Sequence, residues 1–208
     1  MTLEDIIKKI LQNKKDVKIN EEKLRNQAQI AEQIWREIEK NDSGKLFVFR
    51  APPGYGKTEV FSSLIIKNFL QDEWYFPKAY IVEPTHALLT QMKDRLEKSI
   101  STFQLNDIFV SEDHGELVYP SYLYSGTVMV TTVDAYVYGY VAKRVKNGGG
   151  ESGRFSMPVG LEVNSLTVFD EIHLIQDEAY LGPNVMSKII CPLVKAGGYV
   201  LLNSATIT

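Results

Sequence analysis

The amino-acid sequence predicts an α/β domain in which helices cover both faces of a parallel β-sheet. Near-continuous apolar runs of strand length alternate with longer segments of helical periodicity, as in sheets whose strands are buried on both sides. The chain has 208 residues, of which 44% are hydrophobic, and this is enough for one sizeable core. A glycine-rich segment joins the first apolar run to the next helical segment and marks a tight strand-to-helix connection.

Charge and cysteine content restrict the class of protein. Lys and Arg number 23 and Asp and Glu number 26, so the formal net charge is −3 and gives no indication of nucleic-acid binding. The single cysteine, Cys191, excludes a disulfide framework and a cysteine zinc cluster and fits a reducing compartment. No apolar run approaches the roughly 18 residues that span a bilayer, and the N-terminus does not resemble a signal peptide. We therefore expect a cytoplasmic protein with no membrane partner.

Residues 1–18 are predicted to form a short helix followed by a charged linker. Thr2 and Asp5 have the spacing of a capping pair, and isoleucines and leucines follow at helical intervals. A second helix carries an apolar stripe from Leu24 to Ile38 and ends at an Asn-Asp-Ser-Gly run. We expect residues 19–208 to form one domain.

The rest of the chain alternates between the two kinds of element. Strands are expected at 46–50, 79–83, 107–111, 127–131, 166–170 and 199–203, and helices at 58–70, 87–100, 133–144 and 178–194. A glycine run at 147–153 is expected to be a mobile loop. We expect the first strand to be central in the sheet, with the strand that ends at Asp170 next to it, so that the residues after both meet at the carboxyl edge.

The segment APPGYGKT, residues 51–58, has the form of a phosphate-binding loop. Glycines permit backbone angles that are closed to other residues, so successive N–H groups can turn toward phosphate oxygens at the positive end of the next helix. Lys57 has the reach for the β- and γ-phosphates, and the Thr58 hydroxyl is a ligand for Mg²⁺. The alternative, a chance glycine-rich turn, fits the flanking strand and helix less well. The predicted nucleotide-binding residues of this loop are Gly54, Tyr55, Gly56, Lys57 and Thr58.

A second candidate site follows the apolar strand at 166–170, where the chain reads Asp170-Glu171-Ile172-His173. Carboxylates at this end of a buried parallel strand lie where open α/β sheets bind ligands. We expect Asp170 to hold Mg²⁺, mostly through water, opposite Thr58, and Glu171 to orient or deprotonate the attacking water. The position of His173 beside these carboxylates favours a role next to the γ-phosphate. A solvated acidic strand end is the alternative interpretation.

The chain contains five segments in the order of the motifs of one protein group: APPGYGKT, EPTHALLTQM, TVMVTTVDAY, VFDEIHLIQDEAY and NSAT. They resemble the first RecA-like domain of superfamily 2 DExH helicases and span about three-quarters of the chain. The TTVDAY segment, the basic loop with Arg154-Phe155 and the tyrosine after DEIH are most similar to the helicase subunit of type I CRISPR interference, the partner of an HD nuclease. The resemblance implies a RecA-like P-loop domain that uses ATP and Mg²⁺.

The resemblance also implies contacts beyond the catalytic centre. Arg25 and either Gln27 or Gln29 resemble the adenine-reading Q motif, and their spacing leaves the glutamine open. His86 stands where Arg or Lys is usual. Capping of the next helix is the alternative role for the strand-end threonines. The implied nucleic-acid contacts are Pro84, Thr85, His86, Ser125, Gly126, Thr131 and Thr132, and the residues implied to couple the two sites are Ser204, Ala205 and Thr206.

The implied partners follow from the same resemblance. They are single-stranded nucleic acid, with DNA expected, a second RecA-like domain in cis or in trans, an HD nuclease and a CRISPR surveillance complex. The second domain would supply the arginine finger, and the chain ends two residues after the SAT motif. We therefore expect this chain by itself to bind nucleotide but to have almost no ATPase activity.

Other functions stay open from the residues alone. A DExH RNA helicase, a restriction-type translocase and a non-catalytic recruitment module all fit the motifs. A protein-remodelling ATPase fits less well, because PTHALLTQM and TTVD are not explained by it. A nuclease site is not expected, because the three histidines are followed by Ala87, Gly115 and Leu174 rather than by aspartate.

Overall fold

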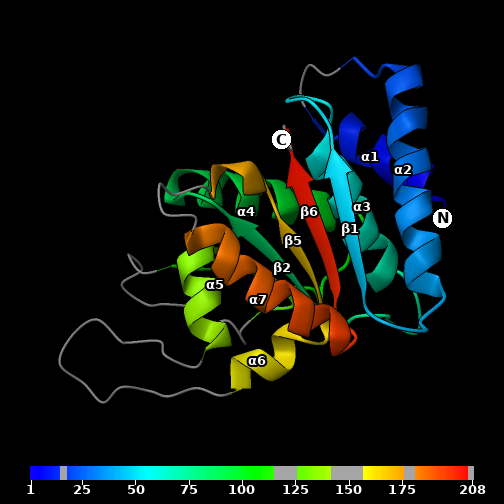
Figure 1. The fold of residues 1–208 in the computed structure, drawn as a ribbon. Coiled ribbons are helices and arrows are strands. Elements are labelled where there is room, and N and C mark those ends of the chain that lie inside the picture. Colours follow the sequence, from blue (N-terminus) through cyan, green and yellow to red (C-terminus); the bar gives the residue numbers. More distant parts are fainter. Residues whose placement is uncertain (15–17, 115–125, 142–156, 176–180, 206–208) are drawn as a thin grey trace.

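The computed structural model describes residues 1–14, 18–114, 126–141, 157–175 and 181–205 (Figure 1). The helices are α1 (Leu3–Gln12), α2 (Glu21–Glu39), α3 (Lys57–Phe69), α4 (His86–Ser101), α5 (Val133–Tyr140), α6 (Met157–Glu162) and α7 (Leu181–Lys195), with a 3-10 turn η1 (Ile172–Leu174). The strands are β1 (Lys45–Arg50), β2 (Lys78–Glu83), β3 (Val110–Asp113), β4 (Val128–Thr132), β5 (Ser165–Phe169) and β6 (Tyr199–Ser204). All five strand pairings are parallel, in the order β1-β6-β5-β2-β4-β3.

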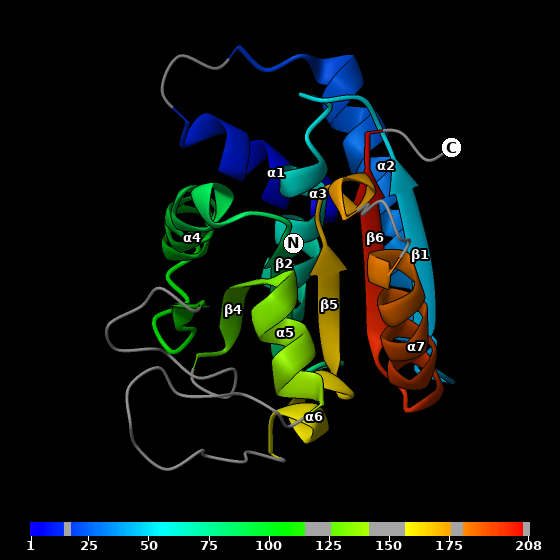
Figure 2. The same ribbon diagram turned by 60° about the vertical axis from the view of Figure 1, so that its left-hand side comes forward.

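Helices cover both faces of the sheet, as expected for strands that are apolar throughout (Figures 1 and 2). On one face, α1, α2, α3 and α4 contribute to one core cluster with residues such as Trp35, Phe61 and Leu96. On the other face, α5 and α7 contribute Tyr136 and Leu193 to a second cluster. The predicted α/β fold with a parallel sheet is therefore confirmed.

The position of β1 differs from the prediction. Among the described strands β1 pairs only with β6, so it lies at one edge of the sheet and β6 separates it from β5. The expectation of a central β1 beside the Asp170 strand is therefore wrong. The exposure of the side chains agrees with this position: Leu46 and Val48 of β1 are 48% and 58% exposed, whereas Val200 and Leu201 of β6 are fully buried. Which strand lies at the edge is decided by pairing between distant segments, which the local pattern of apolar residues does not contain.

The N-terminal helix α1 packs into the same core as the helix that follows the phosphate loop. Thr2 and Asp5 form the capping box that their spacing predicts. Ile6 and Ile7 are fully buried against the cluster that also holds Leu64 of α3. Residues 1–14 are thus part of the structure around the candidate site, with 15–17 outside the described residues.

Several element boundaries differ from the sequence-based expectation. Strand β3 begins at Val110, later than expected, because the register with β4 pairs Val110 with Val128. Helix α6 is not anticipated by the sequence, since Pro158 and Gly160 within it are typical of loops. The glycine run and the ends expected for two helices fall at 142–156 and 176–180, outside the described residues. None of the helices in the described ranges has the length and apolarity that a membrane crossing requires.

Candidate nucleotide-binding site

The phosphate loop connects β1 to α3 and depends on two glycines with left-handed backbone angles. Gly54 has a φ of 74° and Gly56 a φ of 99°. A Cβ atom at Gly56 would lie 1.8 Å from Nε2 of Gln27, so a larger residue would have to displace that side chain in addition to adopting the left-handed backbone angle. Gly56 is the N-cap of α3 and supplies no side-chain cap. The first N–H groups of α3 are thus oriented for an anionic ligand.

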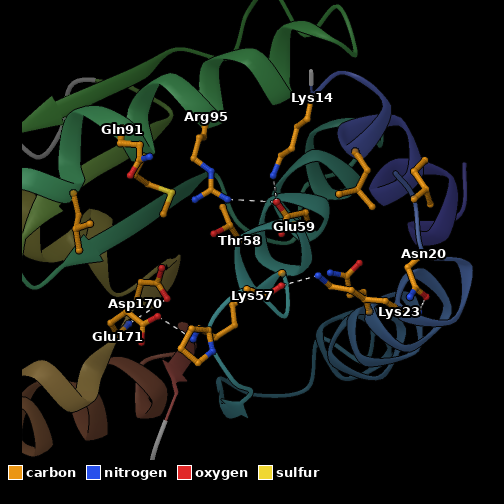
Figure 3. Close-up of a pocket in the computed structure, with 18 of the residues that line it drawn as sticks. Lys14, Asn20, Lys23, Lys57, Thr58, Glu59, Gln91, Arg95, Asp170 and Glu171 are labelled. Carbon is orange, nitrogen blue, oxygen red and sulfur yellow. Dashed lines mark hydrogen bonds and ion pairs between the residues drawn. The ribbon is translucent and has the colours of Figure 1, made fainter. Parts of the chain in front are cut away.

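Lys57 and Glu171 form an ion pair across the site. Nζ of Lys57 lies 2.9 Å from Oε1 of Glu171 and 3.3 Å from the carbonyl oxygen of Ala51. The Lys57 side chain is 7% exposed, so the pair is shielded from solvent on the lysine side. Figure 3 shows the two side chains facing one another, with Thr58 nearby. The phosphate loop and the acidic strand end therefore meet in one place, although β6 lies between their strands.

Asp170 follows β5 and is 6% exposed. Its backbone N–H donates to the carbonyl oxygen of Val82 at 3.0 Å, and its Oδ1 accepts from the N–H of Glu171 at 3.1 Å. Burial and the neighbouring Glu171 charge raise the pKa of Asp170, while Asn203 and Lys57 act in the opposite direction. Glu171 has a φ of 45°, and this turn directs the chain into η1.

His173 connects the acidic pair to the end of β6. Its Nδ1 lies 3.4 Å from Oε2 of Glu171 and 3.2 Å from the Ser204 hydroxyl. A continuous series of polar contacts therefore runs from β6 to the phosphate loop, through Ser204, His173, Glu171 and Lys57. Ala205 follows in the described residues, and Thr206 lies outside them.

Glu83 is an acidic residue of the site that sequence reasoning missed. It ends β2, is 1% exposed and lines the same pocket as Lys57 and Asp170. Burial, with the Asp170 and Glu171 charges, raises the pKa of Glu83 to about 8, and Arg95 acts in the opposite direction. The available signal was the repeated pattern of an apolar strand that ends in a carboxylate, AYIVE as well as LTVFD.

The pocket around these groups has a volume of about 510 Å³. Its cationic lining comes from the segment between α1 and α2 and from α2, α3 and α4, as Figure 3 shows for Lys14, Lys23 and Arg95. Lys23 donates to the carbonyl oxygen of Gly54 at 2.6 Å. The charged lining residues are Lys14, Lys18, Lys23, Lys57, Arg95, Glu59, Glu83, Asp170 and Glu171.

Glu59 connects α3 to the segment after α1 and to α4. It is paired with Lys14, which follows α1, and with Nη2 of Arg95 on α4 at 3.4 Å. Burial alone would raise the pKa of Glu59, but its bond with Lys14 and the two nearby positive charges hold that pKa below its usual value. Glu59 thereby stabilises the cationic side of the pocket.

The structure distinguishes between the two glutamines of the implied adenine-reading motif. Gln27 is 1% exposed, lines the pocket and donates through Nε2 to the carbonyl oxygen of Tyr55 at 2.7 Å. Gln29 and Arg25 are exposed and line a different hollow on α2. Of these three residues, only Gln27 contacts the phosphate loop.

The threonine hydroxyl groups that are expected to contact nucleic acid differ in their exposure to solvent. Thr131 is fully buried and its hydroxyl donates to the carbonyl oxygen of Asp113 at 2.8 Å, so this placement does not support a contact between its side chain and nucleic acid. Thr132 accepts from the N–H of Ala135 at 3.2 Å, which is the capping role left open above. Thr85 is exposed and makes no side-chain cap for α4.

The other residues implied to contact nucleic acid lie at opposite ends of the strands. Pro84 and His86 follow the carboxyl end of β2, whereas Gly126 precedes the start of β4. Pro84 is half-buried and His86 is exposed, and the ring of His86 lies 3.3 Å from that of His114 between their Nδ1 atoms. Gly126 has a φ of 74° and its carbonyl oxygen accepts from Lys78 at the start of β2. Ser125 lies outside the described residues.

The donor groups present fit a nucleotide with magnesium. The Thr58 hydroxyl and the Asp170 carboxylate both line the pocket, and hard oxygen donors are the ligands that Mg²⁺ prefers. The described residues contain no group of three or more His, Cys, Asp or Glu side chains arranged to hold a metal ion by themselves. Magnesium in nucleotide sites takes one or two protein ligands and completes its shell with phosphate and water.

Comparison with known sequences gives a family match over most of the chain. A family model described as DEAD/DEAH box helicase matches residues 26–208. The chain is 45% identical over 195 residues to a protein described as CRISPR-associated helicase Cas3 from Thermoproteus tenax. This match covers 91% of the chain but 33% of the relative, so the chain spans about a third of the relative's length.

Solved structures of helicases have a similar fold. The DUF1998 helicase MrfA bound to DNA and AMPPNP has a TM-score of 0.63 and 19% identity, covering 98% of this chain and 26% of that one. The T. fusca Cas3-ADP structure has a TM-score of 0.58 and 19% identity, covering 82% of this chain and 20% of that one. At these identities the likeness concerns the arrangement of helices and strands, which is the RecA-like core of such helicases.

Proposed function

Because the chain belongs to the DEAD/DEAH box helicase family, we propose that it is the ATP-binding half of a nucleic-acid motor. The observation that carries the proposal is the 2.9 Å contact between Lys57 and Glu171, which brings the phosphate loop and the acidic strand end into one pocket. The relative from Thermoproteus tenax supports a narrower assignment, a CRISPR-associated helicase that unwinds target DNA for a nuclease.

The geometry suggests how ATP engages the site. The N–H groups at the start of α3 and the Lys57 ammonium would bind the β- and γ-phosphates. A phosphate bound by Lys57 would compete with Glu171 for the ammonium group, so nucleotide binding would weaken this ion pair and free the Glu171 carboxylate. Glu171 then accepts a proton from the attacking water. Nδ1 of His173 lies 3.4 Å from Oε2 of Glu171 and would orient this carboxylate. Gln27, next to the loop carbonyl at Tyr55, is our candidate for reading adenine.

Thr58 and Asp170 are the residues that would hold Mg²⁺, Asp170 mostly through water. The ion supplies charge neutralisation on the phosphate oxygens during transfer. Asp170 lines the pocket and is 6% exposed, so its carboxylate is largely shielded from bulk solvent.

Single-stranded DNA is the proposed substrate of the motor. The residues proposed to contact its backbone are Pro84, Thr85, His86, Ser125 and Gly126, and such contacts require no base-specific groups. Ser204, Ala205 and Thr206 would couple the two sites, because Ser204 contacts His173 at 3.2 Å. A second RecA-like domain, an HD nuclease and a CRISPR surveillance complex complete the proposed set of partners.

Titration of the chain with a fluorescent ATP analogue and Mg²⁺ tests the proposal. Wild type is expected to bind. Lys57→Ala should lose affinity at least roughly tenfold, because a charge-assisted phosphate contact disappears. Glu171→Gln should bind as well as wild type or better, because Lys57 loses a competing partner. Glu97→Gln, an exposed change on α4 away from the pocket, is the control and should match wild type. Equal binding by wild type and Lys57→Ala would contradict the proposal.

A further inference from the structure

Glu83 is a buried acidic residue in the nucleotide pocket to which the proposed chemistry gives no role. Its side chain is 1% exposed and lines the pocket. Its Oε1 has no hydrogen-bond partner among the described residues. Burial of a carboxylate oxygen without a donor costs free energy, and most buried polar groups in folded proteins have a partner. Glu83 therefore holds an unsatisfied acceptor atom at the wall of the pocket.

The strand register determines which groups Glu83 faces. Val82 of β2 pairs with Phe169 of β5, and Asp170 donates its N–H to the carbonyl oxygen of Val82 at 3.0 Å. Val82 and Phe169 both belong to the core cluster beneath α5 and α7. Because side chains alternate along a strand, Glu83 and Asp170 are turned to the opposite face, where the pocket lies.

The charges around Glu83 are mainly of its own sign. Asp170 and Glu171 are the neighbouring acids, and Arg95 on α4 is the cation that acts on it. Arg95 is already engaged with Glu59 at 3.4 Å. Lys57 is paired with Glu171 at 2.9 Å. A ligand that brings positive charge and O–H donors would satisfy the unpaired oxygen and relieve the repulsion among the three acids.

A hydrated magnesium ion has both properties. Mg²⁺ keeps several of its water molecules when it binds between a carboxylate and phosphates. Carboxylates that accept hydrogen bonds from such waters orient the ion and strengthen its binding. We propose that Glu83 accepts a hydrogen bond from a water molecule of the magnesium ion that accompanies the nucleotide, as a positioning residue outside the direct ligands. This inference rests on the proposed nucleotide function.

The magnesium dependence of ADP binding tests the assignment. The affinity of the 208-residue chain for a fluorescent ADP is measured with Mg²⁺ and with EDTA. In wild type Mg²⁺ should strengthen binding. In Glu83→Gln this enhancement should fall roughly tenfold, the effect of losing one charge-assisted hydrogen bond. Affinity in EDTA should stay equal to that of wild type, because the role assigned to Glu83 requires the ion.

Glu162→Gln is the matched control. Glu162 is also 1% exposed and lacks side-chain hydrogen-bond partners in the described ranges, but it lies outside the pocket. It should keep the wild-type magnesium enhancement. Thermal unfolding without ligand shows whether both variants are folded, and each should melt near the wild-type temperature because glutamine is close to glutamate in size and shape.

The outcomes separate this inference from the function on which it rests. Equal magnesium enhancement in wild type and Glu83→Gln overturns the role of Glu83 and leaves nucleotide binding intact. A parallel loss of affinity with Mg²⁺ and with EDTA also overturns it, because Glu83 would then act on the nucleotide or the fold rather than on the ion. Lack of ADP binding by wild type overturns the proposed function and this assignment together.

Discussion

At the scale of single residues, Glu162 shows what burial does to an acidic group away from the candidate site. It ends α6, and in the described structure neither side-chain oxygen has a hydrogen-bond partner. The Ser165 hydroxyl donates instead to its backbone oxygen at 2.6 Å. Burial raises the pKa of Glu162 from 4.5 to about 8. The folded protein therefore holds a proton that the unfolded chain releases at neutral pH.

The stability of wild type relative to Glu162→Gln is expected to fall as the pH rises from 4.5 to about 8 and then to level off. In this range the folded state binds more protons than the unfolded state, so a rising pH favours unfolding. The free energy of unfolding of wild type, relative to that of Glu162→Gln, is expected to change by a few kcal/mol over this pH range. Urea unfolding of both proteins between about pH 5 and about pH 9 measures it. A difference that does not vary with pH would show that Glu162 is not buried in its protonated form.

At the scale of elements, the phosphate loop depends on the helix α2 that packs beside it. Gln27 is held between them by its 2.7 Å bond to the Tyr55 carbonyl oxygen. A Cβ at Gly56 would collide with this side chain at 1.8 Å, whereas a Cβ at Gly54 would meet nothing within 4 Å. Both glycines share the left-handed backbone angle. An alanine at either position therefore meets the cost of the left-handed backbone angle, but only an alanine at Gly56 also collides with a neighbouring side chain.

Gly56→Ala is expected to destabilise the chain by roughly 1–3 kcal/mol more than Gly54→Ala, because overpacking against Gln27 adds to the backbone cost that both share. The free energy of unfolding in urea measures this for both variants. Gly56→Ala should also displace Gln27 from the pocket and weaken nucleotide binding. Equal destabilisation by the two substitutions would contradict the predicted contact with α2.

At the scale of the whole molecule, the sheet brings together residues that are more than a hundred positions apart. The phosphate loop at 51–58 and the acidic strand end at 170–173 come from strands separated by β6, yet Lys57 and Glu171 touch. Lysines from the N-terminal part and Arg95 of α4 complete the pocket from the other side (Figure 3). The site is thus assembled from most of the chain.

The chain by itself is expected to bind nucleotide but to hydrolyse it about 10³–10⁵-fold more slowly than a complete motor, the usual contribution of an arginine finger. The proposed second RecA-like domain would supply that group. Phosphate release is measured with and without single-stranded DNA, for this chain and for a longer protein that includes the second domain. Single-stranded RNA is the matched control for substrate class. Rapid DNA-stimulated turnover by the chain alone would contradict the expectation.

Much of the fold and of the candidate site follows from local sequence patterns. The capping pair at Thr2 and Asp5 forms as its spacing predicts. Gly54 and Gly56 adopt the backbone angles that the phosphate-loop pattern requires. The short helix α6 was missed because Pro158 and Gly160 disfavour helices locally, and packing against β5 and α5 outweighs that preference.

The sequence by itself determined the alternation of strands and helices, the parallel sheet and the chemistry of the phosphate loop and of the DEIH strand end, because these depend on neighbouring residues along the chain. Only the tertiary structure decided that β1 lies at the sheet edge, that Gln27 rather than Gln29 touches the loop, and that Thr131 is buried. It also placed Glu83 beside Asp170. Strand order, register and the face that a side chain occupies are set by pairing between distant segments, and no local pattern contains that information.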